Sequence, residues 1–168
     1  MTLRTAALAG IAIALVVAAC GGEEADLTPD ERLELQEYLA GVDALLDVAV
    51  EKFNTDDPLM SLQPLDPPET EAEAIRISLG WYAMFWNDFA NDLTDLQPPA
   101  RAEAAHGNWI EVARTIADAN EAALLQPDLE SAQSLFEGLE GSQVLACLNM
   151  QEIVDNANIS VDLNCRFE

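Results

Sequence analysis

Basic residues are scarce in this sequence of 168 residues. Lys52 is the only lysine and His106 the only histidine, and seven lysines and arginines face 31 aspartates and glutamates, which gives a net charge of −24. A surface this acidic repels nucleic acid and anionic lipid headgroups, so we expect neither of them as a partner. It favours cations or basic partners, but a well-solvated acidic surface is the favoured interpretation over a dedicated cation site, and adaptation to salty surroundings is a further explanation of this composition.

The usual patterns of catalysis and cofactor binding are also missing. A Ser-His-Asp arrangement would have to use His106, and no Gly-x-Ser-x-Gly elbow accompanies that histidine. The chain has no phosphate-cradling glycine loop, no Cys/His zinc spacing and no EF-hand loop. The sequence therefore predicts a non-enzymatic protein with no cofactor and no metal.

The first twenty residues have the layout of an export signal. Residues 1–4 carry one positive charge, residues 5–19 are an uncharged run of small and aliphatic side chains, and Cys20-Gly21-Gly22 follow. Val17-Ala18-Ala19-Cys20 resembles the lipobox of bacterial lipoproteins, in which the chain is cut before the cysteine and that cysteine is lipidated. This resemblance, confined to residues 1–22, implies an exported domain anchored by lipid to the cell membrane or an outer membrane. An ordinary cleaved secretory peptide and an uncleaved N-terminal anchor are the alternatives.

The lipobox interpretation divides the chain into three parts. They are a signal peptide at 1–19, a lipidated Cys20 with a flexible tether at 20–27, and a single domain at 28–168. The mature chain has 149 residues, which is 168 less the 19 removed, and this length suits one hydrophobic core. Because Arg4 leaves with the signal, six basic residues remain against 31 acidic ones, for a net charge of −25.

Two cysteines remain once Cys20 is assigned to the lipid. Cys147 and Cys165 form an even pair in an exported, oxidising setting, so we expect a disulfide between them. A reactive dithiol is the functional alternative, but no Cys-x-x-Cys spacing supports it.

Apolar residues recur at helical spacing along most of the chain after residue 27, which predicts an all-α fold. Thr28 and Glu31 are placed for a capping box, and Ser142 for the cap of the last helix. We expect helices at about 29–53, 69–96, 100–126, 128–138 and 142–156, with a proline-containing crossover loop at 54–68. The last two helices together form a broken fourth one. The predicted architecture is an antiparallel bundle of about four helices.

The C-terminal residues change period. Apolar and polar residues alternate from Ile159 to Arg166, which is a strand-like pattern. Because an isolated strand is not stable, we expect an extended tail that lies along a groove of the bundle and is held by the disulfide.

An aromatic run, Trp81-Tyr82-Ala83-Met84-Phe85-Trp86, is the most distinctive stretch of the predicted domain. As a binding hypothesis, Trp81, Trp86 and Trp109 line a pocket for an apolar or sugar-like ligand. As a core hypothesis, aromatic side chains at helical spacing fill the interior, and the clustering of most of this run on one face favours this interpretation. Trp81 and Met84 deviate from that face, so they are the better candidates for a surface contact.

His106 is the remaining candidate for a site. It lies on the apolar stripe of the third predicted helix, and Glu103 precedes it at the Glu-x-x-His spacing of carboxylate-bridged metal sites in helical bundles. Such sites need a second motif of this kind, which the chain lacks, so a core histidine is the favoured interpretation. The sequence thus predicts a membrane-anchored envelope protein that binds, bridges or senses a partner. The alternative is a helical lipoprotein that binds a small molecule or metal through His106, Glu103 and the three tryptophans.

Overall fold

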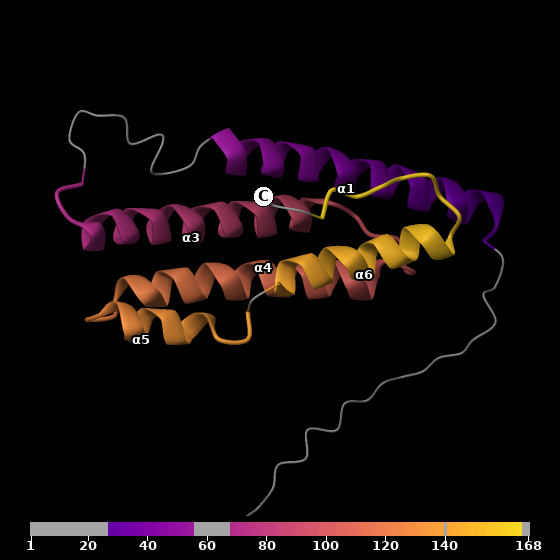
Figure 1. The fold of residues 1–168 in the computed structure, drawn as a ribbon. Coiled ribbons are helices and arrows are strands. Elements are labelled where there is room, and N and C mark those ends of the chain that lie inside the picture. The colour runs from indigo at the N-terminus through magenta and orange to yellow at the C-terminus, as the bar shows by residue number, and fades with distance from the viewer. Residues whose placement is uncertain (1–26, 56–67, 140, 166–168) are drawn as a thin grey trace, which may run out of the picture.

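The computed structural model describes residues 27–55, 68–139 and 141–165. Its elements in chain order are α1 (Pro29–Thr55), α3 (Glu71–Asp95), α4 (Glu103–Leu124), α5 (Leu129–Gln133), the 3-10 turn η1 (Ser134–Phe136) and α6 (Ser142–Asn156). No strand occurs within these ranges. The chain is an antiparallel helical bundle, as predicted, with α1 along α3, and with α4 packed between α3 and α6 (Figure 1). The break expected in the fourth helix lies between η1 and α6.

Local side-chain caps determine where the first two helices begin. The Thr28 N–H donates to Glu31 Oε2 at 2.9 Å and the Glu31 N–H donates to Thr28 Oγ1 at 3.3 Å, which is the predicted capping box. α3 begins two residues later than expected, because Thr70 is its N-cap and Thr70 Oγ1 accepts the N–H of Glu73 at 3.2 Å.

Two predictions about the fourth helix need correction. Ser142 is not the cap of α6: Gly141 holds that position with φ of +72°, and the Ser142 hydroxyl instead donates to the carbonyl of Leu139 at 2.7 Å. The short helix expected at 128–138 ends at Gln133 and continues only as a 3-10 turn, after which Gly138 adopts φ of +84°. Glycine meets the left-handed conformation at both positions without steric cost.

The core is built from the apolar stripes of α1, α3, α4 and α6. The side chains that are completely or almost completely buried share these stripes; they include Leu35, Leu39, Val42, Leu46, Phe85, Phe89, Leu93, Trp109, Ala113, Met150 and Val154. Each helix thus contributes the face that its sequence period predicts. The packing leaves acidic side chains on the outside of the bundle, since the only buried polar residues of the described ranges are His106 and Asn120.

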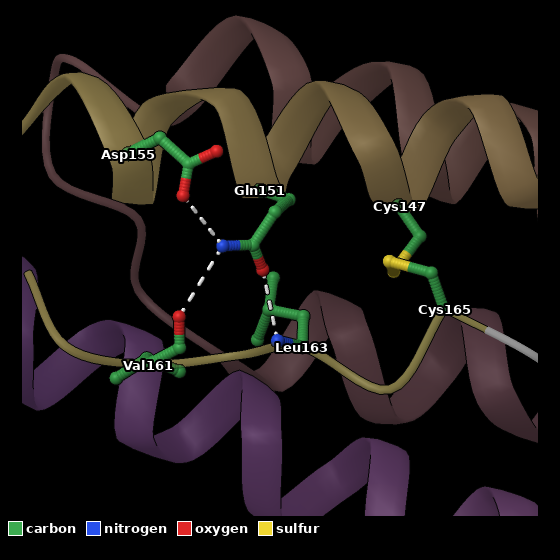
Figure 2. The surroundings of a disulfide bond; sticks show 6 residues. All are labelled: Cys147, Gln151, Asp155, Val161, Leu163 and Cys165. Carbon is green, nitrogen blue, oxygen red and sulfur yellow. Dashed lines mark hydrogen bonds between the residues drawn. A yellow bond between two sulfur atoms is a disulfide. The ribbon is translucent and has the colours of Figure 1, made fainter.

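The C-terminal tail is extended and lies between α6 and α1 (Figures 1 and 2). Its alternation is confirmed, because Ile159, Leu163 and Cys165 are buried while the intervening polar residues are exposed. The Gln151 amide on α6 replaces the missing neighbour strand: its Nε2 donates to the Val161 carbonyl at 3.2 Å and its Oε1 accepts the Leu163 N–H at 2.8 Å. These bonds satisfy backbone groups that an unpaired strand would otherwise leave without partners.

The predicted disulfide is present. Cys147 on α6 is bonded to Cys165 in the tail, with the Cα atoms 5.5 Å apart and 18 residues apart in sequence (Figure 2). Arg32 on α1 holds the start of the tail, since its Nη1 donates to the carbonyl of Ala157 at 2.6 Å. The signal segment with Cys20, and all but the ends of the crossover predicted at 54–68, lie outside the described residues.

Candidate functional site

An aromatic cluster forms where the end of α1 meets the middle of α3. Phe53 from α1 lies with its ring centroid 5.9 Å from those of Trp81 and Tyr82 and 5.4 Å from that of Phe85. Phe85 in turn stacks on Trp81 at 5.2 Å and meets Trp86 edge-on at the same distance. The run on α3 is therefore packed largely into the interior, which agrees with the core interpretation of most of these side chains.

Beside this cluster the surface is hollowed into a pocket of about 270 Å³. Three aromatic side chains (Phe53, Tyr82 and Trp86) contribute to one part of its lining, and the remainder comes from Ile116 on α4 and from Phe136, Leu139, Gly141 and Gln143 around the start of α6. We call this hollow the aromatic pocket. Four separate segments of the chain converge on it, which is the usual construction of a small-molecule site in a helical bundle.

The aromatic pocket differs from three other hollows of the described residues in the lack of charge in its described lining. Lys52, Asp88 and Asp92 line a hollow between α1 and α3, and Glu71, Arg76 and Asp128 line another at the start of α3. A third, near the disulfide, includes Asp162. No charged residue of the described ranges lines the aromatic pocket, whose polar side chains are those of Tyr82 and Gln143. The described lining is thus apolar apart from these two side chains.

The structure places the three candidate tryptophans in different settings. Trp86 lines the aromatic pocket. Trp81 is half-buried and packs on Phe53 and Phe85, whereas Met84, the other residue expected at the surface, is 66% exposed. Trp109 is fully buried in the core, 5.7 Å from Phe89 between ring centroids, and its Nε1 makes no hydrogen bond to any part of the chain that is described. Only Trp86 among the three is thus brought to a hollow.

His106 is buried and hydrogen-bonded to Tyr38. Its Nδ1 lies 2.8 Å from the Tyr38 hydroxyl, and the rings meet edge-on with their centroids 5.7 Å apart. Burial lowers the pKa of His106 below its ordinary value of 6.5 and raises the pKa of Tyr38 above its usual range. The Tyr38 hydroxyl and His106 Nδ1 thus share a hydrogen bond that joins α1 to α4 inside the core, and the tautomer of the imidazole decides which of the two atoms donates.

Glu103 and His106 do not converge on a common centre. The Glu103 side chain is exposed at the first turn of α4, while His106 is buried. Within the described residues no three or more histidine, cysteine, aspartate or glutamate side chains are grouped closely enough to hold a metal ion. The Glu-x-x-His spacing therefore has no companion ligands among them.

Sequence reasoning missed most of the aromatic pocket. Phe53 is visible in the sequence only as the last apolar residue of a helical stripe, and Tyr82 as one of a core-facing group. Phe136 and Gln143 carry no signal at all, since they reach the pocket through the turn of the chain between α5 and α6. The proximity of Phe53 and Trp86 follows from which faces of α1 and α3 meet and at what height along the helices, and a single sequence does not specify this.

Comparisons with known proteins found no relative of this chain. No protein-family model matches the chain, and neither curated proteins nor solved structures gave a significant match. In the part of the chain that the structure describes, no helix is both long enough and apolar enough to cross a membrane.

Proposed function

We propose that this protein is an exported lipoprotein, anchored through Cys20, whose helical domain acts outside the cytoplasm as a non-enzymatic binding or scaffold protein. The observation that carries the proposal is the disulfide between Cys147 and Cys165. Disulfides persist in oxidising compartments and are rare in the cytosol, so this bond supports export. The lipobox-like segment 17–20 then accounts for the third cysteine and for the retention of the domain at a membrane.

The geometry of the bundle is compatible with an anchor at the start of α1. Thr28 begins the first helix at the end of the bundle where α6 finishes, and Arg32 bonds there to the Ala157 carbonyl. Phe53 lies roughly 36 Å further along α1, at about 1.5 Å per residue. A lipid at Cys20 would therefore leave the aromatic pocket well away from the bilayer and open to ligands or partners.

Incorporation of a fatty-acid analogue tests the anchor. Cells that express the full chain are fed an alkyne-tagged fatty acid, and the purified protein is examined for the tag. We expect the tag on the wild-type protein and none on Cys20→Ala, because only a cysteine at this position is acylated under the lipobox interpretation. A variant with Cys147→Ala and Cys165→Ala is the matched control and retains the tag. An untagged wild-type protein, or a tagged Cys20→Ala, contradicts the anchor.

The aromatic pocket favours a second candidate function, in which the domain binds a small apolar molecule. The supporting observation is the uncharged hollow of about 270 Å³ beside Trp86. Ligand sites in proteins are concave and mostly apolar, with a few polar groups that fix orientation, and this hollow has that composition. In this candidate function the binding residues are centred on Trp86, in place of the set of His106, Glu103 and three tryptophans that the sequence suggests.

A further inference from the structure

The described lining of the aromatic pocket carries no charge. The chain carries 31 acidic and only seven basic residues, yet no charge of the described ranges lines this hollow. A ligand anion would have to approach an acidic protein and find no cation in the pocket. The faces of aromatic rings attract a cation, but the described lining offers it no carboxylate to pair with. Because transfer of an ion from water to apolar walls is costly without a partner charge, this lining favours a neutral molecule.

One side of the pocket can donate hydrogen bonds. Gln143 lines it, and no hydrogen bond joins the Gln143 side-chain amide to any described residue. Gln143 is the second residue of α6, where the first N–H, that of Ser142, already donates to the Leu139 carbonyl at 3.0 Å. The Gln143 amide is therefore the group at this otherwise apolar edge that can donate a hydrogen bond to a ligand.

The size of the pocket limits the ligand further. A dry protein cavity of about 150 Å³ accommodates one benzene ring. At about 270 Å³, the aromatic pocket has room for roughly two fused rings. Flat rings also match the walls, because aromatic rings favour offset or edge-on contacts such as Phe53, Tyr82 and Trp86 can offer a guest.

We infer that the aromatic pocket binds a neutral, planar molecule of about two fused rings that carries an oxygen acceptor, and that Gln143 holds this oxygen. The inference rests on the small-molecule candidate above and names the ligand class for that site. Trp86, Tyr82 and Phe53 provide the apolar walls, while Gln143 orients the ligand by its polar edge. The lipid anchor is independent of this inference.

Three probes of similar shape separate the contributions of the ring system, the oxygen atom and the charge to binding. They are 2-naphthol, which is neutral and has one oxygen; naphthalene, which has none; and naphthalene-2-sulfonate, which is an anion. Binding to the full-length protein in non-ionic detergent is measured by equilibrium dialysis. We expect 2-naphthol to bind about fivefold more tightly than naphthalene, the equivalent of one net hydrogen bond, and the sulfonate at least about tenfold more weakly than 2-naphthol.

Substitutions at Gln143 assign the effect to this pocket. Gln143→Leu removes the amide, so 2-naphthol binding should weaken about fivefold while naphthalene binding stays unchanged. Gln143→Phe fills the hollow and should abolish saturable binding of both; it also corrects for partition of the probes into detergent. Gln133→Leu, on the exposed side of α5, is the matched control and should bind like the wild type. Far-ultraviolet circular dichroism verifies that each variant is folded.

The outcomes distinguish the ligand class from the binding function. Preference for 2-naphthol that disappears in Gln143→Leu supports the inference. Equal binding of 2-naphthol and naphthalene, insensitive to Gln143→Leu, overturns the oxygen-bearing class and leaves small-molecule binding in place. Binding of neither probe above the Gln143→Phe background overturns both the inference and the small-molecule candidate. The test of Cys20 acylation is unaffected by any of these results.

Discussion

His106 and Tyr38 are the residues whose ionisation matters most to the interior. Their hydrogen bond of 2.8 Å connects α1 and α4, and burial holds the pKa of His106 below 6.5. The unfolded chain binds a proton to this histidine more readily than the folded one does. The free energy of unfolding is therefore fully retained above about pH 6.5 and decreases as the pH falls from there through the lower pKa of the folded state.

We predict that the wild-type protein loses stability between about pH 6.5 and pH 5, in a range where most carboxylates remain ionised. The double variant Tyr38→Phe with His106→Phe should lose this dependence, because it removes the imidazole and leaves no buried hydroxyl without a partner. Tyr38→Phe alone keeps the imidazole and should keep the dependence. Urea denaturation at several pH values provides the measurement. If the free energy of unfolding depends on pH equally in the wild type and the double variant, His106 is not the cause of this dependence.

At lower pH two helix caps also cause the free energy of unfolding to decrease as the pH falls. Hydrogen bonds from Thr28 hold the pKa of Glu31 below its ordinary value, and bonds from Ser131 do the same for Asp128. The charged carboxylates are thus favoured in the folded state. Their contribution to stability is present above the ordinary pKa of each group and is lost as the pH falls through the lowered one.

At the scale of elements, the tail depends on α6 for its position. It has no neighbouring strand, and it is held by the Gln151 amide, by Arg32 at its start and by the disulfide at Cys165 (Figure 2). Buried Ile159 and Leu163 belong to the same hydrophobic core as the buried side chains of the helices. The disulfide closes a loop of 18 residues that contains the second half of α6 and the whole described tail.

We predict that Cys147→Ala combined with Cys165→Ala lowers the free energy of unfolding by about 3 kcal/mol, the value that loop-closure entropy gives for a loop of this length. Urea denaturation of the oxidised wild type and of the variant measures the difference. Hydrogen exchange of the Leu163 amide should accelerate in the variant, because without the disulfide the hydrogen bond to Gln151 is not sufficient to fix the tail. An unchanged midpoint and unchanged Leu163 exchange would show that the disulfide does not fix this segment.

The helices were predictable because their information is local. Leu35, Leu39, Val42 and Leu46 repeat at helical intervals and all are buried, and the capping box at Thr28 lies within four consecutive residues. Ser142 was misassigned as a cap because a neighbouring glycine took the left-handed conformation and displaced it. The aromatic pocket was beyond sequence reasoning, since Phe53, Trp86 and Gln143 meet only after three helices have packed.

At the scale of the whole molecule, charge is the dominant feature. Lys52 forms an ion pair with Asp88 at 3.1 Å, but seven basic residues are far too few to pair with 31 acidic ones. The folded chain therefore carries substantial repulsion between its own carboxylates, and expansion relieves it. Salt weakens this repulsion, since the Debye length falls from about 10 Å at 0.1 M to about 3 Å at 1 M ionic strength.

We predict that the thermal midpoint of unfolding rises between 0.1 M and 1 M NaCl. Choline chloride should raise it to a similar extent, because screening depends on ionic strength and not on the identity of the cation. Differential scanning calorimetry provides both curves. A midpoint that falls with salt would contradict a stability limited by self-repulsion, and a rise with NaCl alone would indicate a specific sodium site instead.

Intact mass spectrometry of the protein isolated from host membranes tests the lipid anchor, the disulfide and export of the domain in one experiment. We predict a chain of 149 residues that begins at Cys20, carries the added mass of lipid acyl chains, and lacks two hydrogens because Cys147 and Cys165 are joined. Tandem fragmentation should place the lipid on Cys20. A mass for the unprocessed 168 residues, or for a chain cleaved elsewhere with free thiols, would contradict this prediction.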